Sequence, residues 1–339
     1  MRWPRARRKR DREQLQDAQA RSLYERLAIA GDTDAMNSLG LLLSEQGDLR
    51  GARTWLQRAA DAGDPGGMYN LGVLLREQED VEGARTWLQR AADAGHTVAM
   101  SYLGVLLREQ GDAGQARTWY ARAAEAGDPD AMDSLAFLLL EEQETGEART
   151  WYARAAEAGH VGAMSNLGVV LKVQGDLEGA RAWLQRAAEA GHVGAMSNLG
   201  ALLKEQGDAE GARTWLQQAA DAGDPGGMYN LGRLLHEQED LEGARTWHER
   251  AADAGMIDAM TNLGVLLDEQ GETEEAYAWW QRAAATGDTD AMYNLGVRLY
   301  QQGDAEGARI WWQRAADAGD TDAMDALRGN GGAAGEPSS

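Results

Sequence analysis

Cysteine is absent from this 339-residue sequence, and proline and phenylalanine are rare, with five residues and one. Without cysteine the chain can form no disulfide, no thiolate metal site and no cysteine nucleophile. Long apolar runs are also missing: none approaches the about 18 residues that indicate a membrane span. No apolar segment follows the N-terminal arginines, as a secretory signal would require. We therefore expect a cytoplasmic protein with no transmembrane segment.

Positive charge is scarce and unevenly placed. The chain has 33 basic and 55 acidic residues, a net charge of −22, and seven of the basic residues lie within residues 1–12 beside a single acidic one, Asp11. The remainder carries 26 basic and 54 acidic residues, a net of −28, so it repels phosphate backbones. Residues 1–14 are predicted to form a basic disordered arm. The arm has four possible surroundings: nucleic acid, an anionic membrane, the acidic body of the protein itself, or solvent alone. On the acidic body it would form a lid that detaches as salt is added.

The sequence is instead rich in one motif of 32 residues, AMSNLGVVLKVQGDLEGARAWLQRAAEAGHVG at 163–194, which recurs without insertion or deletion. The Ala-Met or Gly-Met pair that opens it begins at Ala35, Gly67, Ala99, Ala131, Ala163, Ala195, Gly227, Ala259, Ala291 and Ala323. Nine repeats span 35–322, a half repeat precedes them at 15–34, and a truncated tenth follows at 323–328. A fixed period of this length indicates a solenoid, predicted here as a single domain over 15–328, before a disordered Gly/Ser/Pro tail at 329–339.

Each repeat is predicted to contain two helices, helix A and helix B. In helix A of the first repeat, apolar or small residues recur at the i, i+3, i+4, i+7 spacing of one helical face. They are Met36, Leu39, Gly40 and Leu43. Gly47 suits a left-handed helix end, and Asp48 is placed to cap helix B. We assign the inward stripe of helix B to Ala52, Trp55, Leu56 and Ala59, with Arg58 facing away.

Glycine recurs in the middle of helix A, where it costs about 1 kcal/mol relative to alanine. The column is Gly40, Gly72, Gly104, Gly168, Gly200, Gly232, Gly264 and Gly296, with Ala136 the exception. A matching tryptophan column runs from Trp55 to Trp311 in steps of 32. We infer that a large side chain of helix B packs directly on the helix A backbone at each glycine.

These columns resemble the tetratricopeptide repeat, whose usual period is 34 residues: Leu39-Gly40, the 46–48 stretch Gln-Gly-Asp, Ala52 and Ala59 all fit it. The joint between repeats is similar to that of the Sel-one-like repeat, as the runs WYARAAEAGH (151–160) and AMSNLG (163–168) show. The turn at 174–176 is shorter than the Gly-rich loop usual in Sel-one-like repeats. The resemblance covers residues 15–328 and implies an all-α, right-handed α-solenoid of stacked antiparallel helix pairs.

The resemblance also implies a concave surface lined by helix A, where such repeats bind peptides or partner domains. Carried over by position, the candidate partner-binding residues are Tyr69, Arg76, Arg108, Lys172, Lys204, Tyr229 and Tyr293. The same surface would include Val73, Val105, Val169, Val265, Val297 and His236. An equal alternative for the basic residues is that they are ordinary cations near a helix C-terminus, where the helix dipole favours them.

Candidates for chemistry are few. His96, His160 and His192 occupy a joint position that is Asp elsewhere, and we interpret them as exposed joint residues rather than metal ligands. The methionine column is interpreted as core. We predict no catalytic residue, no metal site and no cofactor, and hence a non-enzymatic scaffold or adaptor that binds a protein or peptide. The alternative is a regulatory or assembly factor whose basic arm docks on nucleic acid or an anionic membrane while the solenoid holds a protein.

Overall fold

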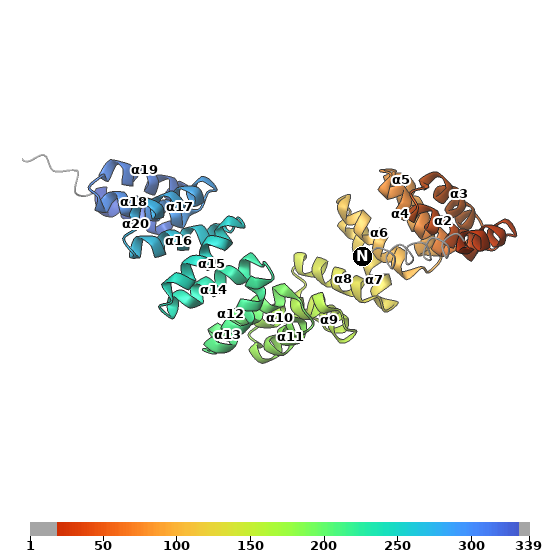
Figure 1. Cartoon of the computed structure of the whole chain (residues 1–339), viewed down its shortest axis with the longest axis horizontal. Helices are drawn as coiled ribbons and strands as arrows, with labels where there is room; N and C mark the ends of the chain where they lie inside the picture. Colours follow the sequence, from red (N-terminus) through yellow and green to blue (C-terminus); the bar gives the residue numbers. More distant parts are fainter. Residues whose placement is uncertain (1–18, 332–339) are drawn as a thin grey trace, which may run out of the picture. The chain divides into compact units, whose positions relative to one another are not determined.

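The computed structural model describes residues 19–331 (Figure 1). The basic arm predicted at 1–14 lies outside these residues, as does the predicted tail from residue 332 onward. Residues 19–29 are helical, which agrees with a lone helix B in the half repeat. The last helix extends to Gly331 and so includes residues 329–331, which the sequence assigned to the tail.

The described chain consists of helices joined by short turns, with no strand between residues 19 and 331. The A helices are α2 (Thr33–Glu45), α4 (Pro65–Glu77), α6 (Thr97–Glu109), α8 (Pro129–Glu141), α10 (Val161–Val173), α12 (Val193–Glu205), α14 (Pro225–Glu237), α16 (Ile257–Glu269), α18 (Thr289–Gln301) and α20 (Thr321–Gly331). The B helices are α3 (Leu49–Asp61), α5 (Val81–Asp93), α7 (Ala113–Glu125), α9 (Thr145–Glu157), α11 (Leu177–Glu189), α13 (Ala209–Asp221), α15 (Leu241–Asp253), α17 (Thr273–Ala285) and α19 (Ala305–Asp317). The all-α helix-pair prediction is confirmed.

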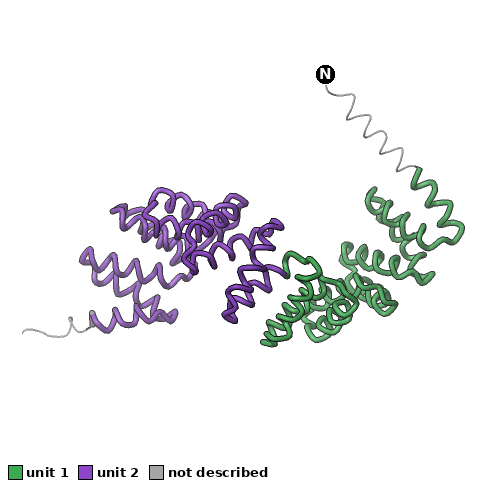
Figure 2. Tube along the Cα trace, turned by 90° about the horizontal axis from the view of Figure 1, so that it is seen from below, with its two compact units in different colours: residues 1–163 green, residues 164–339 purple. Residues whose placement is uncertain are grey.

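The chain divides into two compact units, residues 1–163 and 164–339, with the boundary near the start of α10 (Figure 2). Within each unit, the A and B helices of one repeat pack together, and each B helix packs on the following A helix. Contacts between A helices of neighbouring repeats, as between α2 and α4 or α12 and α14, complete the stack. None of the helices described is both long enough and apolar enough to cross a membrane.

The turn between helix A and helix B follows the predicted chemistry. Gly47 has a φ of 81°, and the Asp48 carboxylate accepts a hydrogen bond of 2.9 Å from the backbone N–H of Gly51. Three repeats place a side chain at the left-handed position instead: Glu79, Gln143 and Glu239, with φ of 64°, 65° and 63°. These residues carry a strain of about 1 kcal/mol or more, because Cβ crowds the carbonyl oxygen in that conformation.

The glycine column packs as inferred. A Cβ added to Gly168 would lie 2.6 Å from Cγ of Leu184, so the helix B side chain rests on the helix A backbone. The side chain that does this is the residue after each tryptophan. The column comprises Leu56, Leu88, Tyr120, Tyr152, Leu184, Leu216, His248, Trp280 and Trp312, all of them buried. Tyr152 belongs to the repeat in which Ala136 replaces the glycine.

The prediction that the tryptophan column lies on the inward stripe is wrong except at Trp119, which is buried. Trp55 is only half-buried, and the buried stripe of α3 consists of Ala52, Leu56, Ala59 and Ala60. Trp55 lies at the edge of that stripe, one helical turn before Arg58, whose guanidinium carbon sits 4.3 Å from the ring centroid. The same cation–π pair recurs three residues apart in seven further repeats, at 4.1–4.7 Å. Trp215 differs, since Gln218 stands where the arginine would be.

Candidate functional site

The seven predicted partner-binding residues all lie on A helices, spread over both units. Tyr69 and Arg76 are on α4 and Arg108 is on α6, within residues 1–163. Lys172, Lys204, Tyr229 and Tyr293 lie on α10, α12, α14 and α18 respectively, within residues 164–339. The structure brings several of them into contact with neighbouring repeats, and these contacts describe the surface better than the residues taken singly.

Four of the five residues at the basic position of helix A pair with glutamates of the next repeat. Lys172 Nζ lies 2.7 Å from a carboxylate oxygen of Glu205, 33 residues later in the sequence. The same spacing and distance join Arg76 to Glu109 and Lys204 to Glu237, and His236 Nε2 lies 2.9 Å from Glu269. Arg108 differs: it lies over the ring of Phe137, 5.5 Å from the centroid. Four of these five side chains therefore connect adjacent A helices. Each exposed pair contributes about 0–1 kcal/mol to the free energy of unfolding.

Arg76 is the centre of a polar and aromatic cluster in residues 1–163. Its Nη1 donates a 2.7 Å hydrogen bond to the Tyr102 hydroxyl, and this bond is the main cause of the raised pKa of Arg76. Tyr69 stacks on the His96 ring at 5.1 Å and meets Tyr102 edge-on at 5.9 Å. Burial raises the pKa of Tyr69, and its hydroxyl stays protonated at neutral pH. Tyr69 thus bridges two repeats and contributes only part of its ring to the surface.

The two remaining tyrosines also contact the following repeat or helix. The Tyr229 hydroxyl accepts a 3.3 Å hydrogen bond from the Asn262 amide, and its ring lies 5.9 Å from that of His248. The backbone carbonyl of Tyr293 accepts a 3.3 Å bond from Nε1 of Trp312, and its side chain packs against the Trp312 cluster. Both are half-buried, so each offers a ring edge to a ligand.

The joint histidines act as helix caps. Nδ1 of His96, His160 and His192 accepts the backbone N–H of Ala99, Ala163 and Ala195 at 2.9–3.1 Å, as aspartate does in other repeats. A ring nitrogen can accept only when it carries no proton, so this cap requires an unprotonated Nδ1. The part of the chain that the structure describes contains no group of three or more His, Asp or Glu residues placed to hold a metal ion.

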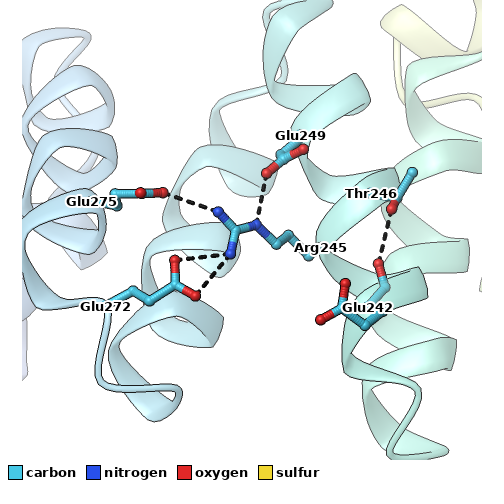
Figure 3. A network of polar contacts seen from close by, with 6 residues as sticks. All are labelled: Glu242, Arg245, Thr246, Glu249, Glu272 and Glu275. Carbon is cyan, nitrogen blue, oxygen red and sulfur yellow. Dashed lines mark hydrogen bonds and ion pairs between the residues drawn. The ribbon is translucent and has the colours of Figure 1, made fainter.

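An arginine network that the sequence did not reveal joins successive B helices on another side of the repeats (Figure 3). Arg245 of α15 binds both carboxylate oxygens of Glu272 at 2.8–2.9 Å, and also Glu249 and Glu275 at 2.9 and 3.0 Å. Hydrogen bonds to Glu249 and Glu272 raise the pKa of Arg245. Glu272 is the N-cap residue of α17, yet its side chain makes no capping hydrogen bond.

In residues 1–163, another N-cap glutamate likewise binds an arginine instead of capping its own helix. Glu144, the N-cap of α9, caps nothing and instead accepts two 2.9 Å bonds from Arg117 of α7. The bonds to Arg117 also lower the pKa of Glu144. Glutamate is one methylene longer than the aspartate found at other caps, so its carboxylate reaches the preceding repeat rather than its own helix.

Two hollows open on the A helices within residues 164–339. A pocket of about 330 Å³ over α10 and α12 is lined by Val169, Lys172, Val173, Leu184, Asn198 and Ala201. A smaller one of about 120 Å³ over α14 and α16 is lined by Arg233, His236, Glu237, Asn262 and Val265. Four of these lining residues, Val169, Lys172, His236 and Val265, belong to the surface that the sequence assigned to ligand binding.

Family models match most of the described chain. Three models of the tetratricopeptide repeat match residues 33–62, 63–99, 97–122, 161–190, 193–222, 228–254 and 256–287. The model of the Sel1 repeat, the Sel-one-like repeat of the sequence analysis, matches residues 134–160 and 289–320. No curated protein sequence matches the chain significantly.

Three solved structures are similar to this chain to differing degrees. A Sel1 repeat protein from Oxalobacter formigenes is 25% identical with a TM-score of 0.62, covering 87% of this chain and 93% of that one. The protective antigen c5321 of uropathogenic Escherichia coli, described as having an SLR fold, is 26% identical over 89% of this chain and 80% of its own, with a TM-score of 0.43. PilF of Pseudomonas aeruginosa is 19% identical with a TM-score of 0.51, over 62% of this chain and 97% of its own.

The 32-residue helix pairs, the family models and the solved Sel1 repeat protein from Oxalobacter formigenes agree. The chain belongs to the tetratricopeptide and Sel1 repeat proteins, α-solenoids that generally mediate protein–protein interactions.

Proposed function

We propose that this protein is a non-enzymatic scaffold that holds a peptide or a partner domain on the exposed side of its A helices. The proposal rests on the residue that follows the central glycine or alanine of each helix A. Apolar side chains are left exposed there, including Phe137 at 42% and Val169 at 41%. Ligand pockets are typically apolar hollows with a few polar groups at their rims, and both hollows of residues 164–339 include this position.

The outer side of the B helices offers its aromatic rings and polar groups to a partner less, although these helices also expose Leu49 and Ile310. Its tryptophans are already covered by arginines, as in the pair formed by Trp87 and Arg90 at 4.1 Å. Its glutamines donate to acidic residues one turn later, as Gln89 does to Asp93 at 2.9 Å. Polar groups that are already paired add little to the binding of a new partner on either side, since the existing bonds must be broken first.

The histidines support a non-catalytic role. His96, His160 and His192 cap helices, His236 pairs with Glu269, and His248 is buried. Each is therefore held in a structural contact, whereas a general base must reach a substrate proton. The repeat families to which the chain belongs are typically non-catalytic.

The test uses the full chain as bait in a lysate of its host, with captured proteins identified by mass spectrometry. Phe137→Asp together with Val169→Asp places two charges on the exposed side of the A helices. The matched control, Thr118→Asp with Thr214→Asp, places two charges at exposed positions on the B helices. We expect a protein partner that is lost with the first double variant and kept with the second. No captured protein, or a partner lost only with the control, would refute the proposal.

A further inference from the structure

Because the repeats have the same length, the residue at any position can be compared with the residues at the same position of the other repeats, which we call the repeat reference. At the last residue of helix A this reference is glutamate, in Glu45, Glu77, Glu109, Glu141, Glu205, Glu237 and Glu269, with Gln301 in the last complete repeat. Val173 is the one apolar residue of this column. At the position after the central glycine or alanine the reference is a larger side chain, in Leu41, Val73, Val105, Phe137, Val169, Arg233, Val265 and Val297. Ala201 is the smallest residue of that column.

The two residues that differ from their columns, Val173 and Ala201, lie at the same pocket. Val173 and Ala201 both line the pocket of about 330 Å³ over α10 and α12, with the buried Leu184 beneath. The small Ala201 leaves room that a valine would occupy, and Val173 turns a charged rim into an apolar one. Val173 is 82% exposed, the highest value of any large apolar residue described. The pocket volume lies at the lower end of the about 300–1,000 Å³ typical of ligand pockets, which suits an inserted side chain.

The charge around this pocket differs from that of the rest of the chain. Among the described helices, α10 is the one without any aspartate or glutamate, and Lys172 is its single charged residue. Together α10 and α12 carry two lysines and one glutamate; Lys172 pairs with Glu205, and Lys204 pairs with Glu237 of α14. Lys172 donates one bond to Glu205, while an ammonium has three donors. Asn198 is exposed at the pocket wall and supplies an amide that can both donate and accept.

We propose that this pocket is the anchor point for a segment of a partner protein that inserts one bulky aliphatic or aromatic side chain next to an acidic residue. The inference rests on the proposed scaffold function and gives it a location and a ligand chemistry. The apolar side chain fills the space above Leu184 between Val169, Val173 and Ala201. The neighbouring carboxylate reaches Lys172, and Asn198 bonds the backbone of the segment.

The probe is a phage-displayed library of random dodecapeptides, selected on the immobilised full chain. Two variants return the pocket to the repeat reference: Ala201→Val refills the space, and Val173→Glu restores the charged rim. The matched control is Gln218→Arg, which also restores a repeat residue but on the outer side of α13. Circular dichroism establishes that all three variants remain helical, and enriched peptides are then measured by fluorescence anisotropy.

We expect enriched peptides to share a bulky apolar residue within two positions of Asp or Glu. Ala201→Val and Val173→Glu should each weaken their binding at least tenfold, and Gln218→Arg should leave it unchanged. Peptides that bind both pocket variants like the parent would overturn the pocket while leaving the scaffold function standing. Enriched peptides with Lys or Arg beside the apolar residue would overturn the proposed chemistry. No enrichment on any protein would count against both this proposal and a peptide-binding scaffold.

Discussion

His248 makes the stability of its repeat depend on pH. It occupies the column where other repeats place Leu, Tyr or Trp on the helix A backbone, and its side chain is 1% exposed against Gly232. Its Nδ1 is buried without a hydrogen-bond partner. Burial, and then the nearby positive charges of His236 and Arg233, lower the pKa of His248 to about 4. The native repeat therefore holds a neutral imidazole well below the pH at which an unfolded histidine becomes charged.

The sign and size of the effect follow from proton linkage. An unfolded histidine has a pKa of about 6.5, so between that value and about 4 the unfolded chain binds a proton that the native chain does not. The free energy of unfolding is unaffected above this window and falls as the pH drops through it. The difference of about 2.5 pKa units corresponds to about 3 kcal/mol when the window has been crossed, and to about 2 kcal/mol at pH 5.

The variant His248→Leu restores the leucine found at this position in α3, α5, α11 and α13. We expect it to raise the free energy of opening of α14 and α15, measured by amide hydrogen exchange on the full chain. The advantage over the parent should be about 2 kcal/mol larger at pH 5 than at pH 7.5. Amides of α4 and α5 serve as the internal control and should not respond to the substitution. An advantage that is the same at both pH values would refute the assignment of a neutral, buried His248.

Three further predictions concern packing, strain and charge. Gly168→Leu should lower the free energy of unfolding by roughly 1–3 kcal/mol, because its side chain overlaps Leu184, and urea melts that match the parent would contradict this contact. Glu239→Gly should raise local stability by about 1 kcal/mol by relieving the left-handed strain, and hydrogen exchange in α14 and α15 that does not slow would show that no strain was present. Lys172→Glu should lower the thermal midpoint by placing like charges together, and adding Glu205→Lys should restore it at low salt; a double variant no more stable than the single one would argue against a Lys172–Glu205 pair.

Local elements of the fold could be predicted from the sequence because they depend on residues close in the chain. A glycine such as Gly47 and the aspartate after it mark one turn, and the helical period marks the faces of each helix. The glycine column also led to the correct kind of contact, a large side chain on the helix A backbone. It did not distinguish Trp55 from Leu56, since adjacent residues of a helix lie about 100° apart and either one could have faced inward.

The contacts between repeats could not be predicted in the same way. Whether Lys172 meets Glu205 depends on how far one A helix is shifted along the next, and a single sequence does not state that shift. A signal was nevertheless present: a basic column is followed directly by a glutamate column, and residues 33 apart therefore have opposite charge in several repeats. The pocket over α10 and α12 is harder to predict from the sequence. It arises because Ala201 is smaller than the other residues of its column and Val173 lacks the charge of the glutamates in its column.

The two glutamate caps bear on how the stack comes apart. The stability of a linear repeat array is approximately the sum of each repeat's own stability and its coupling to its neighbours. An aspartate cap such as Asp48 contributes to the first quantity, since its bond to Gly51 lies within one helix. Glu144 and Glu272 give up that bond and contribute to the second by binding Arg117 and Arg245 of the preceding repeat. Where glutamate replaces aspartate, the cap therefore adds to the coupling of two successive repeats, and we expect these repeats to fray together.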